Sequence, residues 1–60
     1  MTKKHYIAIS AELQAALNLA EGEEARKSVA RIAEGLANIF SVENPRFEKA
    51  RFLRACGIKS

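Results

Sequence analysis

The chain has 60 residues, of which 10 are Lys or Arg and 7 are Asp or Glu, so its formal net charge is +3. A chain of this length buries only about 60 % of the surface that its unfolded form exposes, so we expect one domain, residues 1–60. The single cysteine, Cys56, excludes an intrachain disulfide, and together with His5, the single histidine, it provides too few ligands for a structural zinc site. Stability must therefore come from regular helix packing, from self-association or from both.

A cytoplasmic location is expected from the thiol and from the apolar segments. An unpaired cysteine is typical of a reducing compartment. No stretch reaches the roughly 18 apolar residues of a membrane span, and Glu12 and Gln14 interrupt the first segment where a signal peptide would be uniformly apolar.

The first helix is predicted at about residues 4–19, because apolar residues recur there at steps of three and four. This stripe consists of Tyr6, Ile9, Leu13, Ala16, Leu17 and Ala20. A second apolar stripe on the opposite face consists of Ile7, Ala11, Ala15 and Leu19. A helix that is apolar on both faces is usually buried on both, so it lies either between the other two helices or between two subunits. We favour the subunits and expect a homodimer or higher homo-oligomer through this helix.

The second helix is predicted at residues 23–40, after Gly22, which can adopt the left-handed conformation that commonly closes a helix. Glu23 and Glu24 follow, where the positive end of the helix dipole favours carboxylates. The apolar stripe consists of Ala25, Val29, Ile32, Leu36, Ile39 and Phe40, with Ala33 at its edge. The short connection predicts that the first two helices pack antiparallel.

The third helix is predicted at residues 45–56, with Asn44 as its N-cap, Pro45 in its first turn and Gly57 as its stop. Its inward stripe consists of Phe52, Leu53 and Cys56. The predicted fold is thus all-α without strands. It is a small three-helix domain, an antiparallel helical hairpin plus a shorter C-terminal helix, and it self-associates.

The C-terminal part is the basic pole, since residues 44–60 carry five basic side chains and one acidic side chain. At about 100° per residue, Phe47 cannot share a helix face with Phe52. It falls instead among three arginines, Arg46, Arg51 and Arg54. This cluster is either a contact surface for a partner or a hydrophobic plug whose arginine neighbours snorkel to the solvent. These four residues are the candidate binding site.

Catalytic constellations are mostly excluded. Cys56 has only His5 as a potential base, near a terminus that we expect to fray, so we expect a small core residue rather than a nucleophile. Glu23 and Glu24 are adjacent, so their side chains diverge on a helix. We predict no enzymatic activity, no catalytic residue, no metal site and no cofactor.

The segment NPRFEKARFLRACG, residues 44–57, resembles the C-terminal signature of small proteins encoded by tailed phages, prophages and plasmids. That signature is Asn-Pro-Arg-Phe, three variable residues, a basic residue, Phe-Leu, one variable residue and Ala-Cys-Gly. The matching residues are Asn44, Pro45, Arg46, Phe47, Arg51, Phe52, Leu53, Ala55, Cys56 and Gly57. The start, KKHYIAIS, also resembles that group's basic opening. The resemblance implies an accessory protein of a mobile element, in the cytoplasm of a bacterial host, that binds a host or phage macromolecule.

Three kinds of partner fit the basic and aromatic C-terminal residues. The first is an acidic protein surface, since arginines and aromatics are the usual anchors of interfaces. The second is DNA, because the last two predicted helices flank a short turn as in a helix-turn-helix regulator, although that turn lacks the usual glycine. The third is a small anion such as a nucleotide, held by arginines of two subunits with Phe47 stacked on the base. We favour the protein partner and expect no membrane partner.

Overall fold

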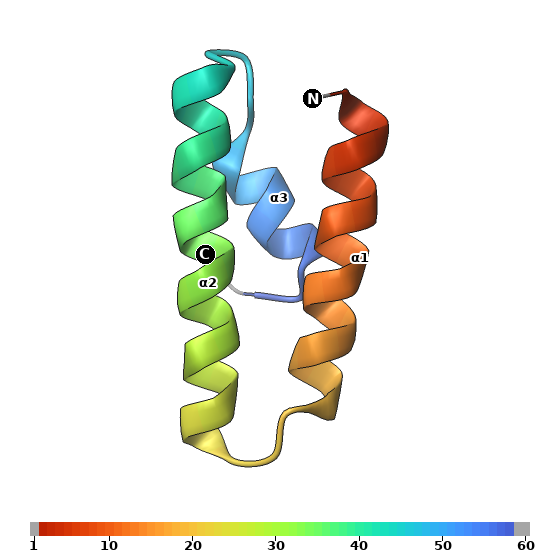
Figure 1. The fold of residues 1–60 in the computed structure, drawn as a ribbon, viewed down its shortest axis with the longest axis vertical. Helices are drawn as coiled ribbons and strands as arrows, with labels where there is room; N and C mark the ends of the chain where they lie inside the picture. Colours follow the sequence, from red (N-terminus) through yellow and green to blue (C-terminus); the bar gives the residue numbers. More distant parts are fainter. Residues whose placement is uncertain (1, 59–60) are drawn as a thin grey trace.

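The structure, a computed structural model, describes residues 2–58, so that Lys59, one of the basic residues counted above, lies outside the described range. It consists of three helices (Figure 1), namely α1 (Lys3–Leu19), α2 (Glu23–Glu43) and α3 (Lys49–Ala55). No strand occurs among the described residues, and the fold is the predicted small all-α three-helix domain. The first two helices match their predicted ranges, although α2 continues three residues further.

α1 and α2 form an antiparallel hairpin that is closed by a short turn at residues 20–22 (Figure 1). Gly22 has a φ of +88°, a conformation that L side chains rarely adopt, so the turn depends on glycine at this position. Glu23 and Glu24 follow in the first turn of α2, where the helix dipole favours carboxylates. The predicted arrangement of the two long helices is therefore confirmed.

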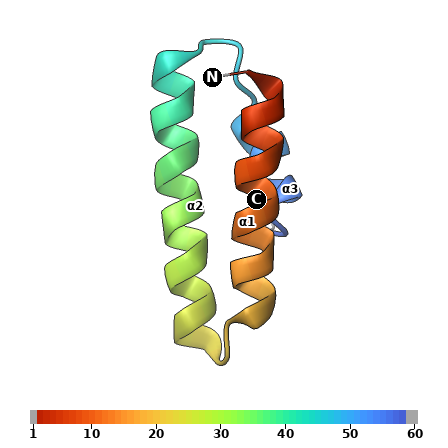
Figure 2. The same cartoon turned by 45° about the vertical axis from the view of Figure 1, so that its right-hand side comes forward.

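α3 packs across one side of this hairpin and contacts both long helices. Figure 2 shows α3 beside α1 on that side, and no described segment crosses the other side of the hairpin. The molecule therefore has one broad side that α3 covers and one that it leaves uncovered.

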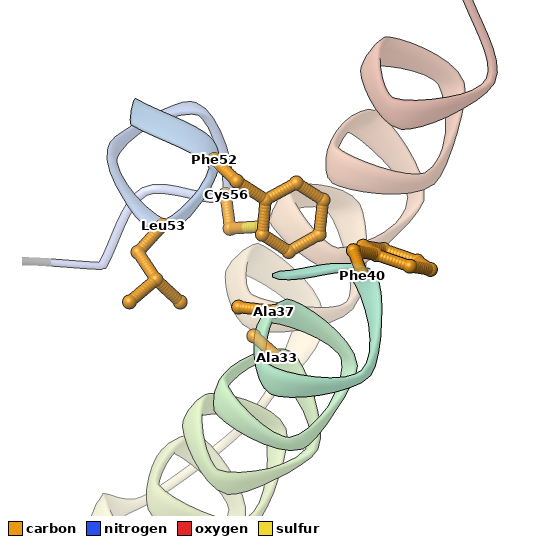
Figure 3. Close-up of a cluster of buried hydrophobic side chains, with 6 residues drawn as sticks. All are labelled: Ala33, Ala37, Phe40, Phe52, Leu53 and Cys56. Carbon is orange, nitrogen blue, oxygen red and sulfur yellow. The ribbon is translucent and has the colours of Figure 1, made fainter. Parts of the chain in front are cut away.

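The core forms where α3 and its C-cap residue meet α2 (Figure 3). Its six buried side chains are Ala33, Ala37 and Phe40 of α2, Phe52 and Leu53 of α3, and Cys56 at the C-cap of α3. Tyr6, Ile9 and Leu13 of α1 pack against this cluster. The predicted inward stripe of α3 is confirmed.

The predicted stripe of α2 is only partly correct. Ile32 and Ile39 are each 56 % exposed, whereas Ala33 and Ala37 are completely buried. The apolar residues do recur at helical spacing. However, α3 packs on a face of α2 that is rotated from the centre of this stripe, so Ala33 and Ala37 are buried in the core instead of the isoleucines. The two isoleucines of the stripe are left largely at the solvent, whereas Leu36 packs in part against the core cluster.

The second stripe of α1 is exposed, because Ile7 is 59 % and Leu19 is 81 % accessible and the two alanines between them are also at the surface. The alternative in which this helix lies between the other two is therefore wrong. The reason is that α2 and α3 both pack against the same side of α1, the side of Tyr6 and Leu13. Ala16, predicted for the inward stripe, is exposed as well.

α3 begins at Lys49, so the prediction of a helix from residue 45 is wrong. The local start signals are present, since the Arg46 N–H donates to Asn44 Oδ1 at 3.1 Å and the Phe47 N–H donates to the Asn44 carbonyl at 2.9 Å. This turn is not continued into a helix, because Glu48 is extended, with φ −99° and ψ 100°. The extended residue lets Phe47 turn toward the core, as the site geometry below shows.

The end of α3 is closed by two hydrogen bonds typical of a glycine-terminated helix. The Gly57 N–H donates to the Arg54 carbonyl and the Ile58 N–H donates to the Leu53 carbonyl, both at 2.9 Å. Gly57 has the required positive φ of 86°. This turn brings Ile58 back onto the core, and the predicted stop at Gly57 is confirmed.

Candidate functional site

Four aromatic rings gather where α1, α2 and residues 44–55 meet. Phe47 lies at the centre of the group, with ring centroids 4.8 Å from Tyr6, 5.5 Å from Phe40 and 5.5 Å from Phe52. All these pairs are tilted or edge-to-face, the arrangements that aromatic rings prefer. The ring of Phe47 is thus part of the core packing, although the residue is only half-buried.

The helix break at Glu48 explains how Phe47 and Phe52 reach the same core. On one continuous helix the two side chains would point roughly 140° apart at about 100° per residue. Because α3 begins only at Lys49, the position of Phe47 is not tied to that rotation. Phe47 therefore has the position of the hydrophobic plug, one of the two predicted alternatives.

A groove of about 330 Å³ opens over this aromatic group, between the first turns of α1 and residues 44–55. Its apolar floor includes Tyr6, Phe47 and Phe52, and Ile7 contributes an exposed side chain. The Ser10 hydroxyl also lines the groove, but it is buried and donates to the Ile7 carbonyl at 2.8 Å. The surface offered to a ligand is therefore apolar at its base.

The rim of the groove is cationic. Lys3, Arg46 and Arg51 line it, together with a single carboxylate, Glu48. Glu48 lies 3.6 Å from an Arg51 guanidinium nitrogen, and both side chains are largely exposed. An exposed pair of this kind contributes about 0 to 1 kcal/mol, so an incoming carboxylate can compete with Glu48 for Arg51. Three positive charges against one negative charge favour an anionic ligand.

The predicted binding residues are divided by the structure. Arg46, Phe47 and Arg51 line the groove, whereas Arg54, in the last turn of α3, is exposed away from it. The groove residues that the sequence analysis did not propose for the site are Asn44, Glu48, Phe52 and Ala55 of the C-terminal part and Lys3, Tyr6, Ile7 and Ser10 of α1. Tyr6 and Ile7 were assigned to the stripes of α1, but no sequence signal placed the start of α1 beside residues 46–51.

The two residues considered for nucleophilic chemistry lie in unsuitable environments. Cys56 is fully buried in the core, and burial raises the pKa of its thiol, which disfavours the reactive thiolate. His5 is exposed in the first turn of α1, where its Nδ1 accepts a hydrogen bond from the Thr2 N–H at 3.3 Å. Within residues 2–58, no group of three or more His, Cys, Asp or Glu side chains could hold a metal ion. Neither Cys56 nor His5 is therefore placed for nucleophilic chemistry.

Comparisons with protein-family models, with curated proteins and with solved structures found no match to this chain. The helices of the described range are also too short or too polar to cross a membrane.

Proposed function

We propose that this chain is a non-enzymatic binding protein whose groove receives an acidic segment of a partner protein. The observation that carries the proposal is the combination of an aromatic floor with the cationic rim of Lys3, Arg46 and Arg51. Apolar side chains of the partner segment would lie on Tyr6 and Phe47, while its carboxylates pair with the rim. Arginine and aromatic side chains are the groups that most often anchor such interfaces.

The origin proposed for the chain is a phage or another mobile element in a bacterial host. Its support is the resemblance of residues 44–57 to the C-terminal signature described above. In the structure this segment contains much of one side of the groove and half of the buried core cluster. A host or phage protein is the proposed partner.

Two other partners fit the geometry less well. A DNA-reading helix needs side chains along its first turns, but α3 has only seven residues, and its preceding residue is the acidic Glu48. A nucleotide base would need a free aromatic face, but the ring of Phe47 packs against three other rings. An acidic peptide requires neither a long helix nor a ring face free for base stacking, because its apolar side chains need only the half-exposed surface of Tyr6 and Phe47.

Titration of a ¹⁵N-labelled chain with a short peptide that alternates Asp or Glu with Leu or Phe tests this proposal by NMR. We expect amide shifts concentrated on Lys3, Tyr6 and residues 46–51. A peptide with Lys in place of Asp and Glu should produce no such shifts. Binding should weaken as salt is raised, since the rim charges are exposed and screened.

A matched pair of variants on α3 separates groove binding from net charge. Arg51→Glu changes a rim residue, whereas Arg54→Glu makes the same charge change three residues away, outside the groove. We expect the dissociation constant for the acidic peptide to rise at least about tenfold for Arg51→Glu, roughly 1.4 kcal/mol, and much less for Arg54→Glu. Equal effects of the two variants, or peptide shifts that avoid the groove, would contradict the proposal. A duplex DNA that binds while the peptide does not would favour the DNA-binding alternative instead.

A further inference from the structure

The uncovered side of the hairpin can be located on α2 from the position of α3. Glu34 and Asn38 of α2 line a small hollow with Leu53 of α3, so this sector of α2 faces α3. Ile32 and Ile39 lie roughly 130° around α2 from them, at about 100° per residue. They therefore lie on the side of α2 turned away from this hollow, where each is 56 % exposed.

A continuous apolar stripe runs along this side of α2. It consists of Ala25, Val29, Ile32, Leu36 and Ile39, at alternating spacings of four and three residues. That alternation is the heptad spacing of a helix that packs along a second helix. α1 adds the exposed Ala16 and the half-buried Ile9, neither of which lines the groove. Ile9 and Leu36 also pack in part against the core cluster, so only the parts of them that remain exposed belong to this side. These seven residues form what we call the open face.

The distribution of side-chain size on α2 indicates that the open face is covered in the functional protein. Ala33 and Ala37 occupy the fully buried positions, while Ile32 and Ile39 remain 56 % exposed. Hydrophobic stabilisation grows with the apolar area removed from water. In an isolated chain, the large side chains of Ile32 and Ile39 therefore contribute less to stability than they would if they were buried. A small domain has few other sources of stability.

Gly35 supports a helix partner on this surface. It lies in the interior of α2, next to Ile32 and Ile39 on the helix surface, and glycine weakens a helix relative to alanine. No atom of the chain lies within 4 Å of a Cβ built at this position, so the described fold does not itself require glycine there. A missing side chain lets another backbone approach closely, as at a packed helix–helix contact.

The charges at the two ends of the hairpin point to a second copy as the occupant. The turn end carries three carboxylates, Glu21, Glu23 and Glu24, against Arg26 and Lys27, a net charge of −1. The opposite end carries Lys4 and the groove-rim residue Lys3 against Glu43, a net charge of +1. The only ion pair at these ends within residues 2–58 joins Glu23 to Lys27, at the long distance of 4.0 Å. A two-fold axis through the middle of the open face reverses the second hairpin, so each acidic turn meets the basic end of the partner.

Such a pairing requires only a modest share of the accessible surface of the chain. A standard interface buries roughly 800 Å² on each partner. That is about one sixth of the 4616 Å² accessible surface of this chain. The open face belongs to one of the two broadest sides of a molecule with Cα extents of 34 × 17 × 14 Å.

From these observations we propose that the open face binds a second copy of this chain, antiparallel and two-fold symmetric, so that two hairpins form a four-helix core. Ile32, Leu36 and Ile39 of both copies are buried at its centre. This places the interface on the α1–α2 hairpin face rather than on the Ile7–Leu19 stripe of α1, and α3 with its groove remains on the outside.

Sedimentation equilibrium of the full chain at micromolar concentration tests the dimer, with an expected mass of about twice 6.6 kDa. Ile32→Lys combined with Ile39→Lys should weaken dimerisation by at least about a hundredfold while far-UV circular dichroism still reports a helical protein. Ile7→Lys is the matched control, because it changes an isoleucine of similar exposure, 59 %, on the groove side. The control should remain dimeric.

A parent chain that stays monomeric throughout the accessible concentration range would overturn the proposal. So would a dimer that Ile7→Lys dissociates and the double variant does not, which would assign assembly to the α1 stripe instead. If the double variant fails to fold, Gly35→Leu decides, since it adds a side chain at an open position and raises helix propensity. A folded Gly35→Leu monomer supports the proposal, and an undiminished Gly35→Leu dimer refutes it.

Discussion

Replacing Phe47 by Ala tests whether this residue belongs to the core. Complete burial of a phenylalanine makes its truncation to alanine cost about 3 to 5 kcal/mol. Phe47 is only half-buried, but it packs against three rings at centroid distances of 4.8 to 5.5 Å. We therefore expect a loss of about 2 to 3 kcal/mol in the free energy of unfolding. A 60-residue domain has roughly 3 to 9 kcal/mol in total, so the variant should be close to unfolding.

Urea unfolding followed by far-UV circular dichroism measures this loss. All variants need the same protein concentration, because association raises the apparent stability of the folded state. Phe47→Leu should retain a large part of the stability, since it keeps apolar volume in the same position. Arg54→Ala, an exposed change on α3, should stay within about 0.5 kcal/mol of the parent chain.

A different outcome would return Phe47 to the predicted contact surface. If Phe47→Ala unfolds within about 0.5 kcal/mol of the parent chain and yet loses the acidic peptide, the ring acts on the partner and not on the fold. The aromatic packing would then contribute little, and the explanation given for the helix break at Glu48 would be wrong.

Two further changes address the end of α3. Because burial raises the pKa of the Cys56 thiol above its ordinary value of 9.0, the folded chain keeps a proton that the unfolded chain loses. The resulting contribution to stability is complete below pH 9.0 and is lost as the pH rises through the raised pKa. The free energy of unfolding of the parent chain should therefore fall as the pH is raised in this alkaline range. In urea titrations this fall should be smaller for Cys56→Ala, which has no thiol to titrate. Gly57→Ala should cost about 1 to 2 kcal/mol in the same assay, because φ is +86° there, whereas Gly57→Asn should cost less since asparagine tolerates that conformation. A Gly57→Ala variant as stable as the parent chain would show that the turn can relax.

The long helices were predictable from the sequence because their signals are local and repeated. The three- and four-residue spacing of apolar side chains sets α1 and α2, and Gly22 and Gly57 mark turns where only glycine adopts the required φ easily. The start of α3 was missed because Asn44 and Pro45 make the same first turn whether or not a helix follows. What decides the outcome is the packing of Phe47 on Tyr6, a contact between residues 41 positions apart in the chain.

The groove was only half predictable for a related reason. Arg46, Phe47 and Arg51 stand out by composition within one short segment. Lys3 and Ile7 carry no comparable signal, since a terminal lysine and an apolar helix residue are common in any chain. They line the groove because α3 packs beside the first turns of α1. The spacing of residues along one helix predicts which side chains share a face, but not which neighbouring helix packs on that face.

The position of α3 sets both which side of the hairpin carries the groove and which side leaves the isoleucines of α2 exposed. Because α3 covers the side of the hairpin near Glu34 and Asn38, the groove that it builds with α1 lies on that side as well. Ile32 and Ile39 lie on the other side, so a second copy docked there leaves Arg46 and Arg51 accessible in both chains. The two proposals therefore place dimerisation and acidic-peptide binding on separate surfaces, and a lysine at position 32 or 39 should leave peptide binding by the folded chain intact. Loss of both properties in one variant would mean that the hairpin, rather than either surface, had been damaged.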